Sequence, residues 1–138
     1  MIVGAYHNDE ASGNAGKVYL YLGSATGLEE TASWTAVGEA AGDCFGWSVS
    51  SAGDVNNDGF DDMLVGAPFS ADMSSGPDGR VFVYLGSATN FGAVPDELVR
   101  VDGVSYFGAN AHGAGDFNGD GWSDWAGCNQ SSGLAPEY

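Results

Sequence analysis

The chain has 138 residues, of which 19 are acidic and three are basic, so its formal net charge is −16 at pH 7. So few cations exclude proteins that bind nucleic acid or anionic lipid through surface charge. Hydrophobic residues make up 43% of the chain, too many for a disordered protein, and no apolar run of about 18 residues is present that could span a membrane.

Three short segments return later in the chain with nearly the same sequence, after 62 or 63 residues. The connections between them change length by one residue, whereas the segments themselves do not. Loops vary in this way while the elements that they join are kept, so the chain is predicted to repeat one structural unit. The pairs are Ile2–Ala5 and Leu64–Ala67, Lys17–Thr26 and Arg80–Thr89, and Phe45-Gly46 and Phe107-Gly108.

One complete unit is predicted to contain four strands. The candidate segments are short, rich in Val, Tyr, Phe and Leu, and bounded by Gly, Asn, Asp and Pro, which is typical of an all-β protein. No part of the chain shows a sustained helical period. The strands are expected over Phe45–Gly53, Asp62–Ala67, Arg80–Leu85 and Glu97–Val101.

An oxygen-rich loop lies between the first and second predicted strands, at residues 54–62, and it returns at residues 116–124. Calcium takes six to eight oxygen ligands, which a short loop supplies when alternate residues point inward around a tight bend. Glycine at the sixth position, Gly59 or Gly121, permits the positive φ of that bend. Neither loop holds a thiolate or an imidazole, which argues against zinc and copper, and magnesium is disfavoured by its strict octahedral geometry.

The sequence therefore predicts two calcium (Ca2+) sites per chain, each with side-chain ligands at positions 1, 3, 5 and 9 and a backbone carbonyl at position 7. An Asx-rich turn that binds nothing is the alternative interpretation. An EF-hand is not expected, because position 12 is Val65 or Gly127 instead of glutamate. The predicted ligands are Asp54, Asn56, Asp58, Phe60 and Asp62 in the first loop and Asp116, Asn118, Asp120, Trp122 and Asp124 in the second.

In chain order, Phe45-Gly46, the loop at 54–62 and Gly66-Ala67-Pro68 resemble the FG-GAP repeat of integrin α-subunits. The resemblance implies β-propeller blades of four antiparallel strands, with calcium between the first and second strands of a blade. Residues 1–62 would form a first repeat that starts within a blade and ends after the first calcium loop. Residues 63–124 would form the second repeat, and residues 125–138 a degenerate strand or tail.

Two repeats are fewer than the roughly four to eight blades that close a propeller, and open blades leave unpaired edge strands. One hypothesis is that copies of the chain associate head to tail as a homo-oligomeric ring. Three copies with six blades, or four with eight, are the simplest closures. The other hypothesis is that the chain is a fragment of a larger propeller, and the sequence leaves both open.

The predicted function is that of a calcium-binding, non-enzymatic recognition or cell-adhesion module with structural calcium, compatible with a protein or glycan ligand at one rim. No nucleophile elbow is present, because the segment that starts at Gly46 lacks its second glycine. The alternatives are a fragment of a calcium-dependent polysaccharide lyase or hydrolase, and a purely structural repeat. Six aromatic residues could form ligand platforms, although packing between blades is favoured: Tyr6, Tyr19, Tyr21, Trp34, Trp47 and Tyr84.

Seven of the acidic residues lie in the two loops, so two bound calcium ions would bring the net charge to −12. Calcium loops of extracellular modules bind at about 10⁻⁴–10⁻³ M. We therefore expect an extracellular, cell-surface or periplasmic setting, and since no signal peptide precedes Ile2, an export signal would lie outside this sequence. Cys44 and Cys128 occupy non-equivalent repeat positions and are expected to be free, buried thiols.

Overall fold

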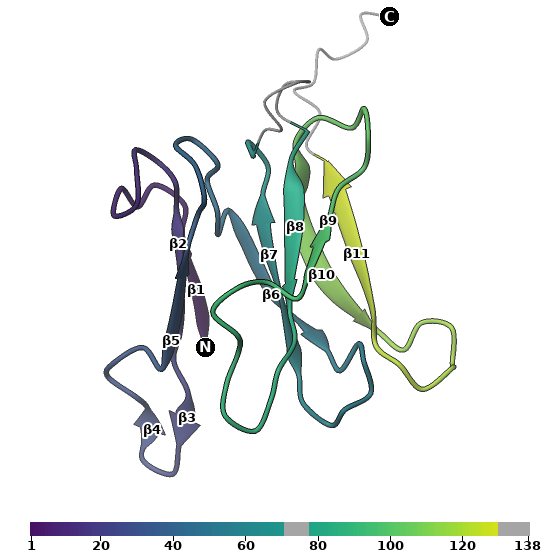
Figure 1. Cartoon of the computed structure of the whole chain (residues 1–138). Helices are drawn as coiled ribbons and strands as arrows, with labels where there is room; N and C mark the ends of the chain where they lie inside the picture. The colour runs from purple at the N-terminus through teal and green to yellow at the C-terminus, as the bar shows by residue number, and fades with distance from the viewer. Residues whose placement is uncertain (71–77, 130–138) are drawn as a thin grey trace, which may run out of the picture.

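The computed structural model describes residues 1–70 and 78–129 (Figure 1). No helix occurs among these residues, and none of them forms a segment suited to crossing a membrane as a helix. The strands are β1 (Ile2–Ala5), β2 (Lys17–Leu20), β3 (Gly23–Ser24), β4 (Gly27–Leu28), β5 (Trp34–Val37), β6 (Ser48–Gly53), β7 (Asp62–Ala67), β8 (Arg80–Tyr84), β9 (Glu97–Val99), β10 (Phe107–Gly115) and β11 (Asp124–Asn129).

The central sheet has four antiparallel strands in the order β6-β7-β8-β9. The sheet β1-β2-β5 lies on one side of it and the pair β10-β11 on the other (Figure 1). By the sequence repeat, β1 and β11 are both equivalent to β7, and β10 is equivalent to β6. The three sheets are therefore successive blades of a β-propeller type, and the all-β prediction is confirmed.

Burial on both faces explains why the second strand of the central blade is so apolar. All six residues of β7 are buried. Because side chains alternate across a strand, Met63 and Val65 face the preceding blade while Leu64 faces the following one. The first inter-blade core contains Val18, Leu20, Trp34, Ala36, Phe45, Met63, Val65, Ala67, Phe82 and Tyr84, and the second contains Ala52, Leu64, Val81, Val83, Phe107 and Ala111.

The predicted strands of the central blade agree with the structure except at their ends. The predicted range Asp62–Ala67 is observed unchanged as β7. The first strand begins at Ser48 instead of Phe45, because Cys44 and Gly46 have φ values of 54° and 85° and turn the chain before the strand starts. The third and fourth strands, β8 and β9, end one and two residues earlier than predicted.

The last described strand, β11, is well formed although its sequence departs from that of β7. It pairs with β10 over six partners, with two register shifts. Cys44 and Cys128 are both free, as expected, but the prediction that Cys128 is buried is wrong. Cys128 is exposed because no further described strand covers the outer side of β11. Positions 130–138 of the predicted tail lie outside the described residues.

Glycines allow adjacent blades to meet backbone to backbone. A methyl group on Gly4 would overlap the carbonyl oxygen of Gly46 in the next blade. One repeat later, a methyl group on Gly66 would overlap the carbonyl oxygen of Gly108 and the hydroxyl of Ser48. The Ser48 hydroxyl also donates to the Gly108 carbonyl at 2.9 Å. The Gly-Ala segment of one blade is thus in contact with the Phe-Gly segment of the next.

Gly66→Ala should therefore destabilise the protein, whereas Gly13→Ala should not, since a methyl group on Gly13 would meet no atom within 4 Å. Overpacking a tight contact costs about 1–3 kcal/mol of the free energy of unfolding. Urea denaturation followed by tryptophan fluorescence measures both variants. Equal midpoints for the two would contradict the proposed role of Gly66.

Candidate metal centre

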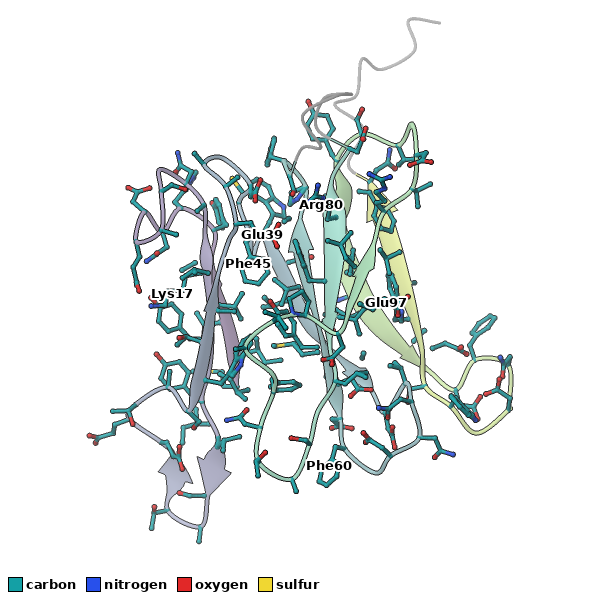
Figure 2. All side chains as sticks on the ribbon, in the orientation of Figure 1. Lys17, Glu39, Phe45, Phe60, Arg80 and Glu97 are labelled. Carbon is teal, nitrogen blue, oxygen red and sulfur yellow. The ribbon has the colours of Figure 1, made fainter. Side chains whose placement is uncertain are left out.

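Both oxygen-rich loops lie at the same end of the molecule, as the β6–β7 and β10–β11 connections (Figure 1). Figure 2 shows Phe60 at this end, opposite Glu39 and Arg80. All ten predicted ligand residues lie in these connections or at the first residue of the strand that follows. The structure therefore brings each set of five together within one short loop.

In the first loop, polar side chains bind the backbone of the bend. The carboxylate of Asp54 accepts hydrogen bonds from the Asp58 N–H at 3.0 Å and the Gly59 N–H at 2.8 Å. The Asn56 side-chain oxygen accepts from the Asp58 N–H at 3.1 Å, and the Asp58 carboxylate accepts from the Phe60 N–H at 3.0 Å. The side-chain oxygens at positions 1, 3 and 5 thus all accept hydrogen bonds from backbone N–H groups of the bend.

The carboxylate of Asp62 closes this loop. One oxygen accepts from the Val55 N–H at 2.7 Å, back at the start of the loop. The other accepts from the Gly86 N–H at 2.8 Å, at the start of the β8–β9 connection. Asp62 is only 1% exposed, and a buried carboxylate needs such donors. The last predicted ligand is therefore fixed by two segments of the same blade.

The second loop repeats this hydrogen-bond pattern. Its positions 4 and 6, Gly119 and Gly121, have φ values of 78° and 91°, close to the 57° and 93° of Asn57 and Gly59 in the first loop. The equivalent bonds are Asp120 N–H and Gly121 N–H to Asp116 at 3.0 and 2.9 Å, Asp120 N–H to Asn118 at 2.9 Å, Trp122 N–H to Asp120 at 3.0 Å, and Phe117 N–H to Asp124 at 2.8 Å. Asp124 is half-buried, and the counterpart of Gly86 would lie beyond the end of this sequence.

Each loop offers three carboxylates, one amide oxygen and one backbone carbonyl, which is a donor set suited to a hard cation such as calcium. Within residues 1–70 and 78–129, no three His, Cys, Asp or Glu side chains are grouped so that they could hold a metal ion. The carboxylates instead accept hydrogen bonds from backbone N–H groups, all of their own loop except that of Gly86, which bonds Asp62. A carboxylate oxygen has a second lone pair, so it can accept an N–H and also coordinate a cation. Metal binding would require the carboxylates of a loop to draw closer together.

A row of aromatic side chains lies on the connections at the opposite end of the molecule. Ring centroids are 4.7 Å apart for Tyr6 and Trp47, 5.5 Å for Trp47 and Phe69, and 5.4 Å for Phe69 and Tyr106. The first three residues are 36–39% exposed. A hollow of about 410 Å³ adjoins the row and reaches buried Cys44. The row contains Phe69 and Tyr106, which the sequence did not identify.

Two other aromatic residues considered as ligand platforms pack between blades instead. The rings of Trp34 and Tyr84 are in edge contact with centroids 5.0 Å apart, and the Trp34 indole N–H donates to the Gly92 carbonyl at 2.9 Å. Both residues belong to the first inter-blade core. The packing interpretation is therefore confirmed for this pair, whereas Tyr6 and Trp47 are available at the surface.

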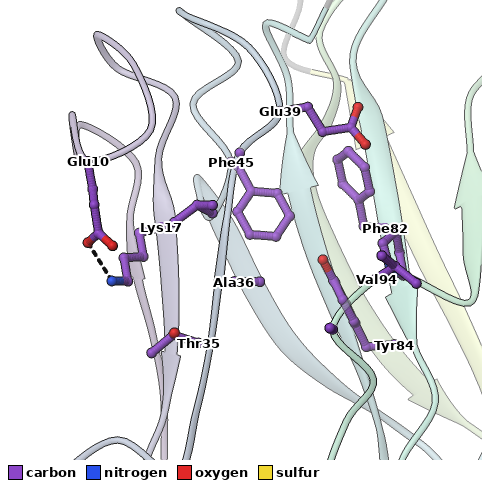
Figure 3. Close-up of a pocket in the computed structure, with 13 residues that line it drawn as sticks. Glu10, Lys17, Thr35, Ala36, Glu39, Phe45, Phe82, Tyr84 and Val94 are labelled. Carbon is purple, nitrogen blue, oxygen red and sulfur yellow. Dashed lines mark hydrogen bonds and ion pairs between the residues drawn. The ribbon is translucent and has the colours of Figure 1, made fainter.

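A groove of about 500 Å³ follows the outer boundary between β5 and β8 (Figure 3). Burial, with the negative charges of Glu39 and Asp96 adding to it, raises the pKa of the Tyr84 hydroxyl far above its usual value. The hydroxyl is therefore neutral at any physiological pH. The Lys17–Glu10 ion pair lies at the groove's edge. The groove is lined by residues that belong to neither metal loop, among them Phe45, Phe82, Tyr84, Ala36, Thr35, Glu39 and Val94.

Comparison with known proteins supports these structural equivalences. The FG-GAP repeat family matches residues 45–84, which run from the Phe-Gly segment to the end of β8. The chain is 33% identical to human integrin alpha-7 over 90% of its own length and 10% of that protein. It is 31% identical to Xenopus laevis integrin alpha-5 over 79% of its length, and 36% identical to Cricetulus griseus integrin alpha-3 over 73%, each match covering 10% of the relative.

The chain spans about a tenth of the length of these relatives. Within that span, the matched residues form the first three strands of the complete central blade and include the whole first oxygen-rich loop. Residues 45–84 therefore form an FG-GAP repeat, and the chain is similar to the integrin α-subunits over most of its length.

Proposed function

We propose that this chain is a calcium-stabilised, non-enzymatic recognition module of a cell-adhesion type that acts in an extracellular, cell-surface or periplasmic setting. The observation that carries the proposal is the recurrence of one loop geometry in two adjacent blades, in which oxygens at positions 1, 3, 5 and 9 accept the same hydrogen bonds from backbone N–H groups. Its similarity to integrin α-subunits, which are adhesion receptors, supports the rest of the proposal.

Calcium would act on stability in this proposal, because its ligands join the first two strands of each blade. Without a cation, the three ligand carboxylates of each loop repel one another, and a bound Ca2+ would reduce the formal charge of each ligand set from −3 to −1. A ligand that binds only the folded state stabilises it by about 2.7 kcal/mol at a hundredfold excess over Kd. The loops would then hold adjacent strands together without taking part in any chemistry.

Calcium should therefore raise the Tm of the wild type, and Asp58→Ala or Asp120→Ala should each remove a large part of that rise. The thermal unfolding of each variant is measured once in calcium and once in chelator. The difference between the two Tm values is then compared among variants. Asp61→Ala is the matched control, because it removes an acid from the first loop at a position that is not a predicted ligand. A wild-type melting curve that is the same in calcium and in chelator would exclude the structural role of the metal.

We further propose that copies of this chain can associate head to tail through their incomplete blades. Among the residues that the structure describes, none supplies the blade β1-β2-β5 with a counterpart of β6, and β10 is equivalent to β6. Since β1 and β11 are equivalent strands, β1 of one copy would replace β11 beside β10 of the next copy. The exposed face of β11 and the unpaired edge of β1 favour such an exchange.

Light scattering in calcium would then give three or four times the mass of one chain, corresponding to six or eight blades. Ile2→Pro should reduce this mass. Met1 and Tyr21 exchange both backbone hydrogen bonds, so the Ile2 N–H points to the open edge of β1 and is a donor that pairing with another copy would use. Wild-type protein that remains monomeric at micromolar concentration would refute head-to-tail association and leave the calcium proposal intact.

The aromatic row at the rim opposite the calcium loops is the proposed ligand surface. Its neighbouring tyrosine, tryptophan and phenylalanine rings offer large rigid contact areas of the kind that dominate recognition sites. The rings belong to connections of three successive blades, so a bound protein or glycan would contact all three.

Screening against immobilised glycans and extracellular-matrix proteins should give saturable binding without release of sugar fragments. Trp47→Ala should weaken this binding about tenfold, because it removes the centre of the row. Phe117→Ala, which removes an 86% exposed ring at the calcium end, should leave binding unchanged. Cleavage of a glycan would support the lyase or hydrolase alternative, and no binding at all would support the structural repeat.

A further inference from the structure

The two metal loops are in direct contact through their backbones. The Ser123 N–H in the second loop donates to the Asp54 carbonyl in the first loop at 2.9 Å. The loops also meet at Gly53, where an added methyl group would lie 2.5 Å from the Ser123 hydroxyl. Ser123 is at position 8 of its loop and is not a predicted ligand. The hydrogen bond nevertheless joins the two predicted sites, because Asp54 is a ligand of the first and Ser123 lies between Trp122 and Asp124, ligands of the second.

The Ser123 N–H belongs to the same peptide unit as the Trp122 carbonyl, the predicted position 7 ligand of the second loop. A peptide unit is conjugated, so a cation on its carbonyl oxygen withdraws electron density from its nitrogen. The N–H then becomes a stronger donor, because groups linked through hydrogen bonds polarise one another. Its acceptor belongs to Asp54, whose carboxylate is the first predicted ligand of the other site.

We propose that Ser123 is a positioning residue that couples the two calcium sites, a proposal that rests on the proposed calcium function. Calcium in the second loop strengthens the hydrogen bond to the Asp54 carbonyl and so holds the start of the first loop in its binding conformation. Coupling between binding sites is reciprocal, so calcium in the first loop favours binding in the second by the same factor. The two sites therefore bind calcium with positive cooperativity.

Direct Coulomb repulsion between the two ions acts in the opposite direction. Each bound Ca2+ adds two positive charges and weakens the attraction of the remaining site for a second ion. At about 0.15 M salt the Debye length is about 8 Å, so much of this repulsion between exposed loops is screened. A substitution that removes only the Ser123 N–H leaves the charges of the ligands unaltered. It therefore measures the part of the coupling that the hydrogen bond carries.

The repeat supplies a matched control for the backbone change. Asp61 in the first loop is equivalent to Ser123, but the described chain places no preceding metal loop beside it. Ser123→Pro removes the N–H that joins the loops, whereas Asp61→Pro makes the same backbone change where no coupling is expected. Ser123→Ala removes only the hydroxyl and keeps the N–H.

Calorimetric titration with calcium chloride in 0.15 M potassium chloride measures the coupling. Asp120→Ala disables the second site and gives the calcium association constant of the first, and Asp58→Ala gives that of the second. The product of these two constants is compared with the overall association constant for two calcium ions in the wild type. The overall constant should exceed this product by about fivefold, which corresponds to a coupling free energy of about 1 kcal/mol. Ser123→Pro should lower the factor to about one, while Ser123→Ala and Asp61→Pro should keep it.

A factor at or below one in the wild type, or an unchanged factor in Ser123→Pro, would overturn the coupling while calcium binding stands. Absence of any calcium-dependent heat in the wild type would overturn the calcium function itself. If Ser123→Pro does not fold, amide NMR of Asp58→Ala decides the question. Filling the second loop should move the Ser123 amide proton downfield, and an unchanged shift would refute the inference.

Discussion

The backbone contact between the Gly-Ala segment of one blade and the Phe-Gly segment of the next is the constraint on which the rest of the structure depends. At Gly66 and Gly108, as at Gly4 and Gly46, no side chain larger than hydrogen fits between the two backbones. Packing at this distance buries both faces of β7 and forms two separate inter-blade cores. An acidic chain with few ion pairs can thereby be stabilised mainly by apolar burial.

The same contact determines where the oxygen-rich loops lie. Once the Phe-Gly segments are fixed, β6 and β10 run side by side, so the loops that follow them leave the blades at adjacent points. The hydrogen bond between Ser123 and Asp54 is a consequence of this arrangement. A contact made far from the loops thus determines the geometry between two candidate cation sites.

The sequence predicts those parts of the molecule that depend on local patterns. The bounds of β7 could be predicted because its apolar run starts directly after Asp62 and ends before Pro68. The loop geometry could be predicted because donor spacing and Gly59 are local features. The start of β6 could not, because nothing in the sequence marks the positive φ of Cys44. Contacts between blades, such as the aromatic row and the Ser123 bond, depend on packing between segments that are far apart in the chain.

The two loops share one ligand pattern, yet the structure does not make them equal. Asp62 is buried and held by two connections of its blade, through Val55 and Gly86, whereas half-buried Asp124 accepts one described hydrogen bond, from Phe117. A ligand that is already fixed loses less conformational entropy when a cation binds. The first loop is therefore the better organised site, because the strands that complete its blade also orient its last carboxylate. Within the described residues, Asp62 is thus held by more of its blade than Asp124 is by its own.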